Sequence, residues 1–316
     1  MPRQHRSRTT WRFAALAMTG LLLGGAACGT STPVPERAAK VTTRTSEAVP
    51  DLRRELRRLE TGFQGRIGAF AIDTETGRTV GYRANERFPM LSTFKAVAAA
   101  AVLSKGREND PGLLDRRVRW RRADLVAFSP VTGQHVDTGL TVAQLCEAAI
   151  TRSDNTAGNL LLRQIGGPAG LTRYVRSLGD PVSRLDRWET ELNLWRPGAR
   201  RDTTAPAYIG RDLHRLTVGN ALDARDRARL VGWLRANTTG DARIRAGLPE
   251  TWTVGDKTGT SDRYGAANDI AIAWPPSSSA PLIISIYTNR HAAGAANDDK
   301  VIATTATLLA ESLGRR

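Results

Sequence analysis

Four short groups of polar residues in this chain have the types and spacing needed for nucleophilic chemistry. In the first group, Ser92 and Lys95 lie three residues apart in the run Met90-Leu91-Ser92-Thr93-Phe94-Lys95-Ala96, which continues alanine-rich and apolar. The run predicts the start of a buried helix on which both side chains share one face. Two interpretations stand: a serine cap with a lysine that reaches water, or a nucleophile whose proton the amine accepts.

Two further groups combine a hydroxyl with other polar side chains. Ser153-Asp154-Asn155 separates two apolar segments that predict helices. It is either a helix cap or a turn that presents a hydroxyl and an amide to a cleft. Lys257-Thr258-Gly259-Thr260 ends a strand predicted from Thr253. It is either a sheet edge protected by lysine or one wall of an anion site, where glycine lets a ligand approach the backbone.

The fourth group lies on a predicted loop between Arg187 and Asp202. This stretch lacks clear periodicity and contains Pro197-Gly198. It has the size of a compact Ω-loop, and its oppositely charged ends could close the neck. Glu189 and Asn193 belong to this loop. The carboxylate of Glu189 is either solvated or held in a cleft as a base.

Lysine is rare in this chain, with only five lysines among 46 basic residues. An arginine stays protonated in proteins, whereas a buried lysine can release its proton. Lys95 and Lys257 both stand in apolar surroundings in the sequence. Both are therefore candidates for acid–base chemistry.

The composition restricts the class of protein. The formal net charge is +15, but the arginines are scattered and often stand beside acids. Since no nucleic-acid-binding module is recognisable, we expect a solvated basic surface and no nucleic-acid partner. Two cysteines, Cys28 and Cys146, cannot form a disulfide framework, and Cys146 is expected to be a buried free thiol. The four histidines form no ligand pattern, so neither a metal nor another cofactor is expected.

The N-terminal residues have the features of an export signal. Residues 1–12 are basic, the next residues up to Ala27 are apolar or small, and Cys28 follows directly. We therefore predict a signal peptide over 1–28 and an extracellular or periplasmic protein. Cys28 is a candidate for a lipid anchor to the outer face of the membrane, although Gly25 stands where a larger aliphatic residue is usual. Residues 29–48 are rich in Thr, Ser and Pro, which predicts a flexible linker.

The rest of the chain predicts an α/β fold. Strands are predicted over 66–72, 79–83, 253–260, 268–274 and 282–288, and the stretch from 92 to about 235 is mostly helical. Strands at both ends indicate one sheet built from both chain ends and flanked by helices, with an inserted helical lobe. The catalytic domain is predicted over 49–316. Its α/β lobe would comprise 49–85 and 236–316, and its helical lobe 86–235.

Taken together and in this order, the four groups resemble the motifs of the class A β-lactamases. The matching residues are Ser92-x-x-Lys95, Ser153-Asp154-Asn155, Glu189-x-x-Leu192-Asn193 and Lys257-Thr258-Gly259. The resemblance extends from about Val49 to the C-terminus. It implies a five-stranded antiparallel sheet, a monomer, and hydrolysis of the β-lactam amide of penicillins and cephalosporins, which confers antibiotic resistance.

The resemblance also implies a role for each site residue. Ser92 is the acylated nucleophile, and Lys95 accepts or relays its proton. Ser153 passes a proton to the leaving nitrogen under the influence of Lys257, and Glu189 activates the hydrolytic water. The backbone N–H groups of Ser92 and Thr260 match the oxyanion hole. The implied substrate-binding residues are Phe128 as an aromatic gatekeeper, Asn155, Asn193, Arg243, Thr258, Gly259 and Thr260.

The chain departs from the family pattern beside the nucleophile, and two rival functions are compatible with part of its motifs. Leu91 and Ser261 stand where members that hydrolyse carbapenems well often carry a disulfide, which lowers the expectation of that activity. A penicillin-binding D,D-peptidase acting on cell-wall peptides is the alternative, because it shares the serine, lysine and Lys-Thr-Gly elements. Glu189 and Asn193 argue against it, since they supply a base for deacylation. A non-catalytic surface lipoprotein would not need this set of residues.

Overall fold

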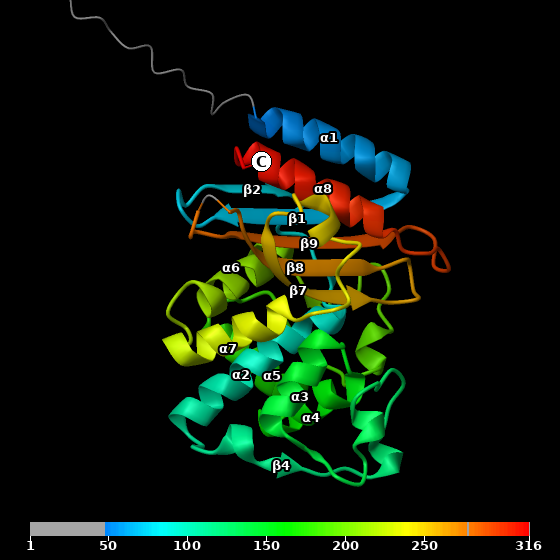
Figure 1. Cartoon of the computed structure of the whole chain (residues 1–316). Coiled ribbons are helices and arrows are strands. Elements are labelled where there is room, and N and C mark those ends of the chain that lie inside the picture. The colour runs from blue at the N-terminus through cyan, green and yellow to red at the C-terminus, as the bar shows by residue number, and fades with distance from the viewer. Residues whose placement is uncertain (1–47, 277, 316) are drawn as a thin grey trace, which may run out of the picture. The chain divides into compact units, whose positions relative to one another are not determined.

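A five-stranded antiparallel sheet lies at the centre of the computed structural model, which describes residues 48–276 and 278–315 (Figure 1). Its strands are β1 (Gly65–Asp73), β2 (Thr79–Tyr82), β7 (Thr253–Thr260), β8 (Ala267–Trp274) and β9 (Leu282–Arg290). The strand order β2-β1-β9-β8-β7 places β1, from the start of the folded chain, beside β9, from its end. The predicted five-stranded antiparallel sheet is therefore confirmed.

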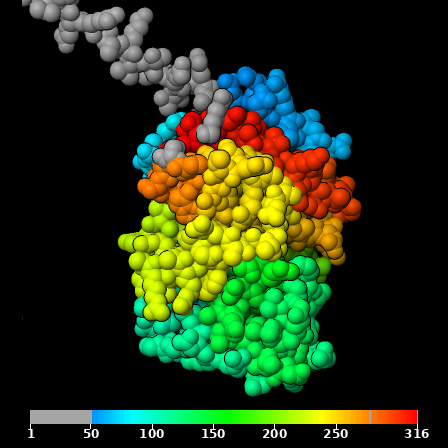
Figure 2. All heavy atoms as spheres, in the orientation of Figure 1, coloured from blue at the N-terminus to red at the C-terminus, as the bar shows by residue number. Residues whose placement is uncertain are grey.

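Both faces of the sheet are covered, which explains why its inner strands are apolar at nearly every position. Helices α1 (Ala48–Phe63) and α8 (Asp299–Ser312) pack on one face, where Ile284 and Ile286 of β9 meet Leu56 and Ile302. Helix α6 (Pro206–Thr217) packs on the other face. In the space-filling view, α1 and α8 form one end of the molecule (Figure 2).

Five more helices follow the first sheet strands in the chain. They are α2 (Phe94–Glu108), α3 (Val142–Thr151), α4 (Asn155–Gln164), α5 (Gly167–Ser177) and α7 (Ala224–Arg235). Two short ladders tie the intervening loops together: β3 (Phe88–Pro89) pairs with β6 (Thr203–Thr204), and β4 (Arg117–Val118) pairs with β5 (Leu140–Thr141). Helix α6 falls within the range 86–235 predicted for the helical lobe, but it packs on β1 and β9.

Helix α2 runs through the middle of the helical part, in contact with α3, α4, α5 and α7. Every residue from Phe94 to Leu103 is buried, so the helix has no polar face over this length. A helix that is apolar all round belongs in a core rather than at a surface. Lys95 is the one charged residue in this buried stretch, and its amine must therefore find partners inside the protein.

Several sequence predictions concern parts of the chain other than the site. The predicted signal peptide and linker lie outside the described residues, except that Ala48 begins α1. Within the described ranges, no helix combines the length and apolar character needed to cross a bilayer. Cys146 is buried and free, as predicted, and burial raises the pKa of its thiol.

Asp180 and Asp212 form a buried pair of carboxyl groups between the end of α5 and α6. Burial, together with the neighbouring charge of Asp180, raises the pKa of Asp212 to about 9. Among the described residues, neither oxygen of the Asp212 carboxyl has a hydrogen-bond partner, and the nearest cation, Arg215, lies 3.6 Å away, so the protonated form is favoured.

This pair predicts a pH-dependent stability. Between about pH 4 and pH 9 the folded protein holds a proton on Asp212 that the unfolded chain releases, so stability falls as the pH rises. Asp212→Asn keeps the shape of the side chain without titrating. The loss of Tm between pH 5 and pH 8 should therefore be smaller in the variant by about 8–16 °C, as measured by calorimetry. The exposed carboxylate of Asp115 gives a matched control, since Asp115→Asn should leave the wild-type pH profile unchanged.

Candidate active site

The four groups of polar residues meet at one cleft of about 700 Å³ beside the edge strand β7. The residues that line it are Ser92, Ala127, Phe128, Ser153, Asn155, Thr190, Asn193, Leu194, Thr239, Thr258, Gly259, Thr260, Ser261, Asp262 and Arg263. Eight of them were predicted as site residues. The four other predicted residues, Lys95, Glu189, Lys257 and Arg243, are buried behind this lining.

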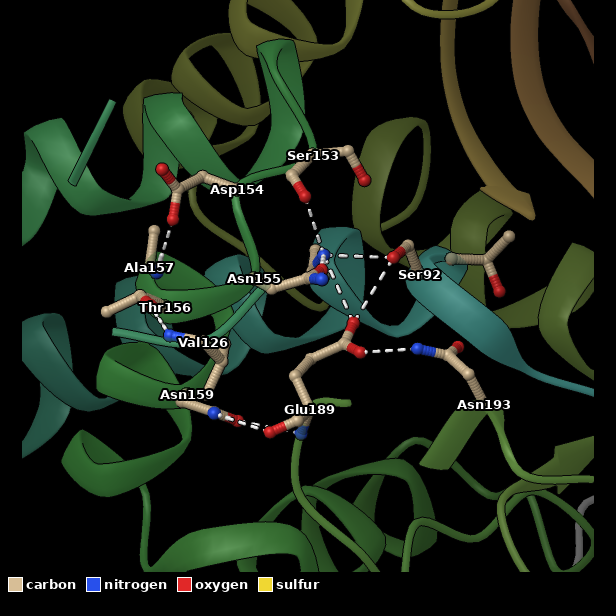
Figure 3. Close-up of polar contacts among 12 residues, drawn as sticks. Ser92, Val126, Ser153, Asp154, Asn155, Thr156, Ala157, Asn159, Glu189 and Asn193 are labelled. Carbon is tan, nitrogen blue, oxygen red and sulfur yellow. Dashed lines mark hydrogen bonds and ion pairs between the residues drawn. The ribbon is translucent and has the colours of Figure 1, made fainter. Parts of the chain in front are cut away.

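Ser92, Lys95 and Glu189 form a closed triangle of polar atoms, and Figure 3 shows the Ser92 hydroxyl facing the Glu189 carboxylate. The Lys95 ammonium lies 2.9 Å from Ser92 Oγ and 3.1 Å from Glu189 Oε1. Ser92 Oγ lies 3.2 Å from the same carboxylate oxygen. Either the amine or the carboxylate is thus within reach of the Ser92 proton, as general-base activation of a serine requires.

The helix-cap interpretation of Ser92 and Lys95 is wrong. The residue at the N-cap of α2 is Thr93, and no side chain caps the helix there. Lys95 has no exposed surface, so its amine does not reach water. The backbone just before the serine is strained, because Leu91 has a φ of +48°, a conformation that side-chain-bearing residues seldom adopt.

The surroundings of Lys95 make its ammonium easier to deprotonate than that of an exposed lysine. Burial lowers the pKa of Lys95, and the neighbouring Glu189 opposes this shift. Besides Ser92 and Glu189, the nitrogen contacts Ser153 O at 2.8 Å and Asn155 Oδ1 at 2.5 Å. Of these four oxygen neighbours only the Ser92 hydroxyl can donate a proton to the lysine nitrogen, because the other three are acceptors. A lowered pKa at such a position is what a proton acceptor needs.

The Ser153-Asp154-Asn155 turn combines both predicted roles. Asp154 caps α4 by accepting from Ala157 N at 2.8 Å, and it also accepts from Val131 N at 2.9 Å. Ser153 has a φ of +53°, and its hydroxyl and the amide of Asn155 line the cleft. The Asp154 cap therefore fixes the turn, while its two neighbours, Ser153 and Asn155, line the cleft.

Lys257 links this turn to the sheet. Its ammonium donates to Ser153 Oγ at 3.0 Å and to Thr258 O at 2.7 Å. Lys257 is fully buried although β7 is an edge strand, so the prediction that it protects the edge is wrong. Burial, and then repulsion from Lys95, lowers the pKa of Lys257 well below its usual value.

The predicted Ω-loop is closed at its neck by the predicted ion pair. Arg187 Nε lies 2.7 Å from Asp202 Oδ2. The other oxygen of this buried carboxylate accepts from the backbone N–H of Arg187 at 2.9 Å. A buried, fully partnered carboxylate is costly to displace, so the neck holds the loop that carries Glu189.

Glu189 is fixed at both its backbone and its side chain. Asn193 Nδ2 donates to Glu189 Oε2 at 2.7 Å. Asn159 accepts from Glu189 N at 2.9 Å and donates to Glu189 O at 2.9 Å (Figure 3). Sequence reasoning missed Asn159. The available signal was its position four residues after Asn155 on α4, which places both amides on one face of the helix.

The wall formed by β7 depends on Gly259. A Cβ at this position would lie 2.9 Å from Leu91 Cβ and 3.1 Å from Ser92 N. Glycine thus lets the strand approach the turn that carries the nucleophile. Ser261 N donates to Ala266 O, which makes Thr260 and Ala267 a pair without mutual hydrogen bonds. The N–H of Thr260 therefore points toward the open edge of β7.

Arg243 differs from its predicted place, because it does not line the cleft. It is 5% exposed and donates to Asp299 Oδ1, Gly259 O and Asn268 O at 2.8–2.9 Å. Its remaining nitrogen donates to Thr260 Oγ1 at 2.7 Å. Arg243 can therefore affect a bound anion in two ways. It orients the Thr260 hydroxyl, and its positive charge attracts the anion without direct contact.

Apolar side chains stand at the mouth of the cleft. Phe128, predicted as a gatekeeper, is 63% exposed, and Leu194 on the Ω-loop is 50% exposed. Sequence reasoning did not single out Leu194. Large exposed apolar side chains beside a polar cleft are typical of a ligand-binding mouth. Among residues 48–276 and 278–315, no cluster of three or more His, Cys, Asp or Glu side chains could hold a metal ion.

Comparisons with known proteins agree with this fold and site. The sequence model of the β-lactamase enzyme family matches residues 51–313. β-Lactamase AST-1 of Nocardia asteroides is 48% identical over 99% of this chain and 98% of its own length. The carbapenem-hydrolysing β-lactamase KPC of Klebsiella oxytoca is 49% identical over 81% of this chain and 87% of its own length.

A solved structure gives the same result. The crystal structure of the β-lactamase from Streptosporangium roseum has a TM-score of 0.83 and 69% sequence identity, over 84% of this chain and 99% of that chain. The fold and these similarities thus define a hydrolase of β-lactams. The chain belongs to the class A β-lactamases, a family of enzymes that hydrolyse β-lactams.

Gly259 gives a prediction for this site. In Gly259→Ala the added methyl group must push β7 away from the Ser92 turn, because the neighbouring atoms belong to a buried backbone. We expect β-lactam hydrolysis to fall on the order of 10- to 100-fold and stability to fall by about 1–3 kcal/mol, measured by steady-state kinetics and denaturant unfolding.

The matched control is Gly62→Ala. Gly62 lies in α1, and an added Cβ would meet nothing within 4 Å. This variant should gain about 0.5–1 kcal/mol of stability and keep its activity. Unchanged hydrolysis in Gly259→Ala would show that the strand does not need this close approach.

Proposed function

We propose that this enzyme hydrolyses penicillins and cephalosporins through an acyl-enzyme on Ser92, which a water activated by Glu189 then hydrolyses. The observation that carries the proposal is the position of the Glu189 carboxylate. One of its oxygens lies 3.2 Å from Ser92 Oγ, and the other accepts from Asn193 Nδ2 at 2.7 Å. A water between Glu189 and Asn193 would therefore lie beside the acylated oxygen.

In the acylation step, Ser92 Oγ attacks the β-lactam carbonyl and its proton leaves to a base. Lys95 and Glu189 are both in contact with Oγ, so either can accept this proton directly or pass it on. The C–N bond of the ring then breaks. Ser153 donates its hydroxyl proton to the leaving nitrogen and is resupplied through Lys257, which lies 3.0 Å away.

The negative charge that develops on the carbonyl oxygen has two donors nearby, the N–H groups of Ser92 and Thr260. The carboxylate of the substrate is proposed to bind Thr258 and Thr260, with the charges of Lys257 and Arg243 behind them. Asn155 and Phe128 line the side of the cleft where the substrate side chain would lie. These roles follow from position and from the family.

In the deacylation step, Glu189 takes a proton from water, and the hydroxide attacks the ester carbonyl. The ester C–O bond breaks, Ser92 regains a proton, and the opened β-lactam leaves as a carboxylate. A group that performs this step distinguishes a β-lactamase from a D,D-peptidase, which would hold the same acyl group for a long time. Hydrolysis of the drug would confer antibiotic resistance.

Carbapenems are not among the proposed substrates. One relative is named for carbapenem hydrolysis. In this chain, however, Leu91 precedes the nucleophile and Ser261 follows Thr260, so a disulfide beside the nucleophile cannot form.

We also propose that the protein is exported and acts as a monomer, with Cys28 as a site of lipid attachment. The basic residues 1–12, the apolar stretch after them and Cys28 support export, and every group of the described site comes from one chain. Intact-mass analysis of the membrane fraction tests the anchor, since a mature chain without added acyl mass would exclude it. Light scattering of the same preparation tests the monomer.

Steady-state turnover and intact mass together test the catalytic proposal. The wild type should hydrolyse benzylpenicillin and a chromogenic cephalosporin for many turnovers. Glu189→Gln keeps the shape of the side chain but removes the base, so turnover should fall by roughly 100-fold or more while a covalent penicilloyl adduct accumulates. A wild type that reacts once and stops would instead identify a D,D-peptidase.

Two controls separate the roles of serine and glutamate. Glu191→Gln makes the same change on an exposed side chain of the same loop, and it should turn over like the wild type. Ser92→Ala should show neither turnover nor an adduct. Normal turnover in Glu189→Gln would rule out Glu189 as the deacylation base.

A further inference from the structure

A row of four polar side chains leads from the wall of the cleft to the interior behind β7. Thr258 Oγ1 lies 2.6 Å from Thr239 Oγ1. Thr239 Oγ1 lies 2.9 Å from Asn237 Oδ1, and Asn237 Nδ2 lies 2.6 Å from Asp256 Oδ2. Thr258 and Thr239 line the cleft, whereas Asn237 and Asp256 are buried. Thr239 has no role in the function described above.

The direction of hydrogen bonding is fixed at the buried end of this row. The backbone N–H of Thr239 donates to Asn237 at 3.2 Å, so the atom that faces Thr239 must be the amide oxygen. The amide nitrogen then faces Asp256, whose other oxygen is held by Arg245 at 2.6 Å. Asn237 therefore presents only an acceptor to the hydroxyl of Thr239.

The hydroxyl of Thr239 has one proton and two oxygen neighbours. When this proton points to Asn237 Oδ1, Thr239 Oγ1 must accept from Thr258, and the Thr258 proton is turned away from the cleft. When it points to Thr258 Oγ1, the Thr258 proton is free to point into the cleft. Hydroxyl protons rotate to suit their partners, so the two arrangements interconvert without moving any heavy atom.

A carboxylate in the cleft favours the second arrangement, because it accepts a hydrogen bond and cannot donate one. In that arrangement, Thr258 donates to the carboxylate while it accepts from Thr239. Hydrogen bonds in such a chain polarise and strengthen one another. Asn237 Oδ1 still accepts from the backbone N–H of Thr239, so no buried acceptor is left without a donor.

We propose that Thr239 is a positioning residue that turns the Thr258 hydroxyl into a hydrogen-bond donor when the substrate carboxylate binds. The inference rests on the proposed function, since it assumes that the carboxylate of a β-lactam occupies this part of the cleft. It makes Thr239 a determinant of the preference for anionic over uncharged β-lactams.

The test compares a penicillin with its methyl ester, which lacks the negative charge. Thr239→Val replaces the hydroxyl with a methyl group of similar size. Its kcat/KM should fall roughly 3- to 10-fold on the acid and change less than twofold on the ester. Thr239→Ser restores the hydroxyl and should recover most of the loss. An equal loss on acid and ester would overturn the proposal, because it would show general damage to the cleft.

A double-mutant cycle separates an action through Thr258 from direct contact with the substrate. If Thr239 acts through Thr258, Thr239→Val should have no further effect on the acid in a Thr258→Val background. Additive losses would overturn the proposed route and indicate direct contact.

Thr238→Val provides a matched control, because this exposed neighbour donates its hydroxyl to Thr151 O at 3.0 Å and does not line the cleft. It should leave the kcat/KM of both acid and ester within twofold of the wild type. Turnover by the wild type separates failure of the proposed function from failure of the role proposed for Thr239. Absence of turnover on the acid would refute the proposed function, whereas normal turnover with an unaffected Thr239→Val would refute only the role of Thr239.

Discussion

The buried contact between Lys95 and Glu189 is the interaction on which the rest of this structure depends. Both side chains are fully buried, and the nitrogen lies 3.1 Å from the carboxylate oxygen. Removing two charges from water is costly, and their attraction offsets that cost only with close geometry and additional hydrogen bonds. Here Ser92, Ser153 and Asn155 supply the bonds to the lysine, and Asn193 supplies one to the glutamate. The partners that stabilise the pair are therefore the groups proposed to carry out the chemistry.

The fold can be understood as the support for this contact. The helical turn Leu91–Thr93 and the first turn of α2 carry Ser92 and Lys95 into the interior, and the apolar side chains around α2 keep solvent from the amine. Gly158 on α4 leaves room for the lysine, since a Cβ there would lie 2.9 Å from Lys95 Cε. The Ω-loop brings Glu189 from the opposite side, held at its neck by Arg187 and Asp202. Removing either support would leave one charge buried without its partner.

The sheet contributes the third side of the site through an unusual edge strand. Strand β7 pairs only with β8 in the five-stranded sheet, and its free edge forms a wall of the cleft. Charges that would normally lie at a surface are instead buried behind this wall, at Lys257 and Arg243. Threonine hydroxyls and backbone N–H groups form the cleft surface in front of these two side chains. An anion in the cleft would therefore contact those groups, with the buried positive charges behind them. A weakly hydrated, pre-oriented wall of this kind favours an anionic ligand over water.

The sequence by itself determined the identity of the fold and of the central residues. Its strands and helices lie close to their predicted positions, because their apolar patterns are long and continuous. Spacing identified Ser92, Lys95, Ser153 and Lys257 as candidate site residues, because each belongs to a short polar group near the predicted end of a helix or strand. Sequence reasoning missed Leu194 and Thr239, which are single residues without a local pattern, and it missed Asn159, whose one signal was its spacing from Asn155. It also placed Arg243 in the cleft, whereas the structure places it behind β7.

The tertiary structure alone excluded interpretations that the sequence left open. A serine and a lysine three residues apart describe a capped helix as well as a nucleophile, and only burial of the amine excludes the first. Likewise, the Glu189 carboxylate could have been solvated until its 3.2 Å distance to Ser92 Oγ was known. The physical reason is that the pKa of a side chain and its ability to transfer a proton depend on solvent exclusion and on partners distant in sequence. Ser92 and Glu189 are 97 positions apart in the chain, and no local signal in the sequence indicates that contact.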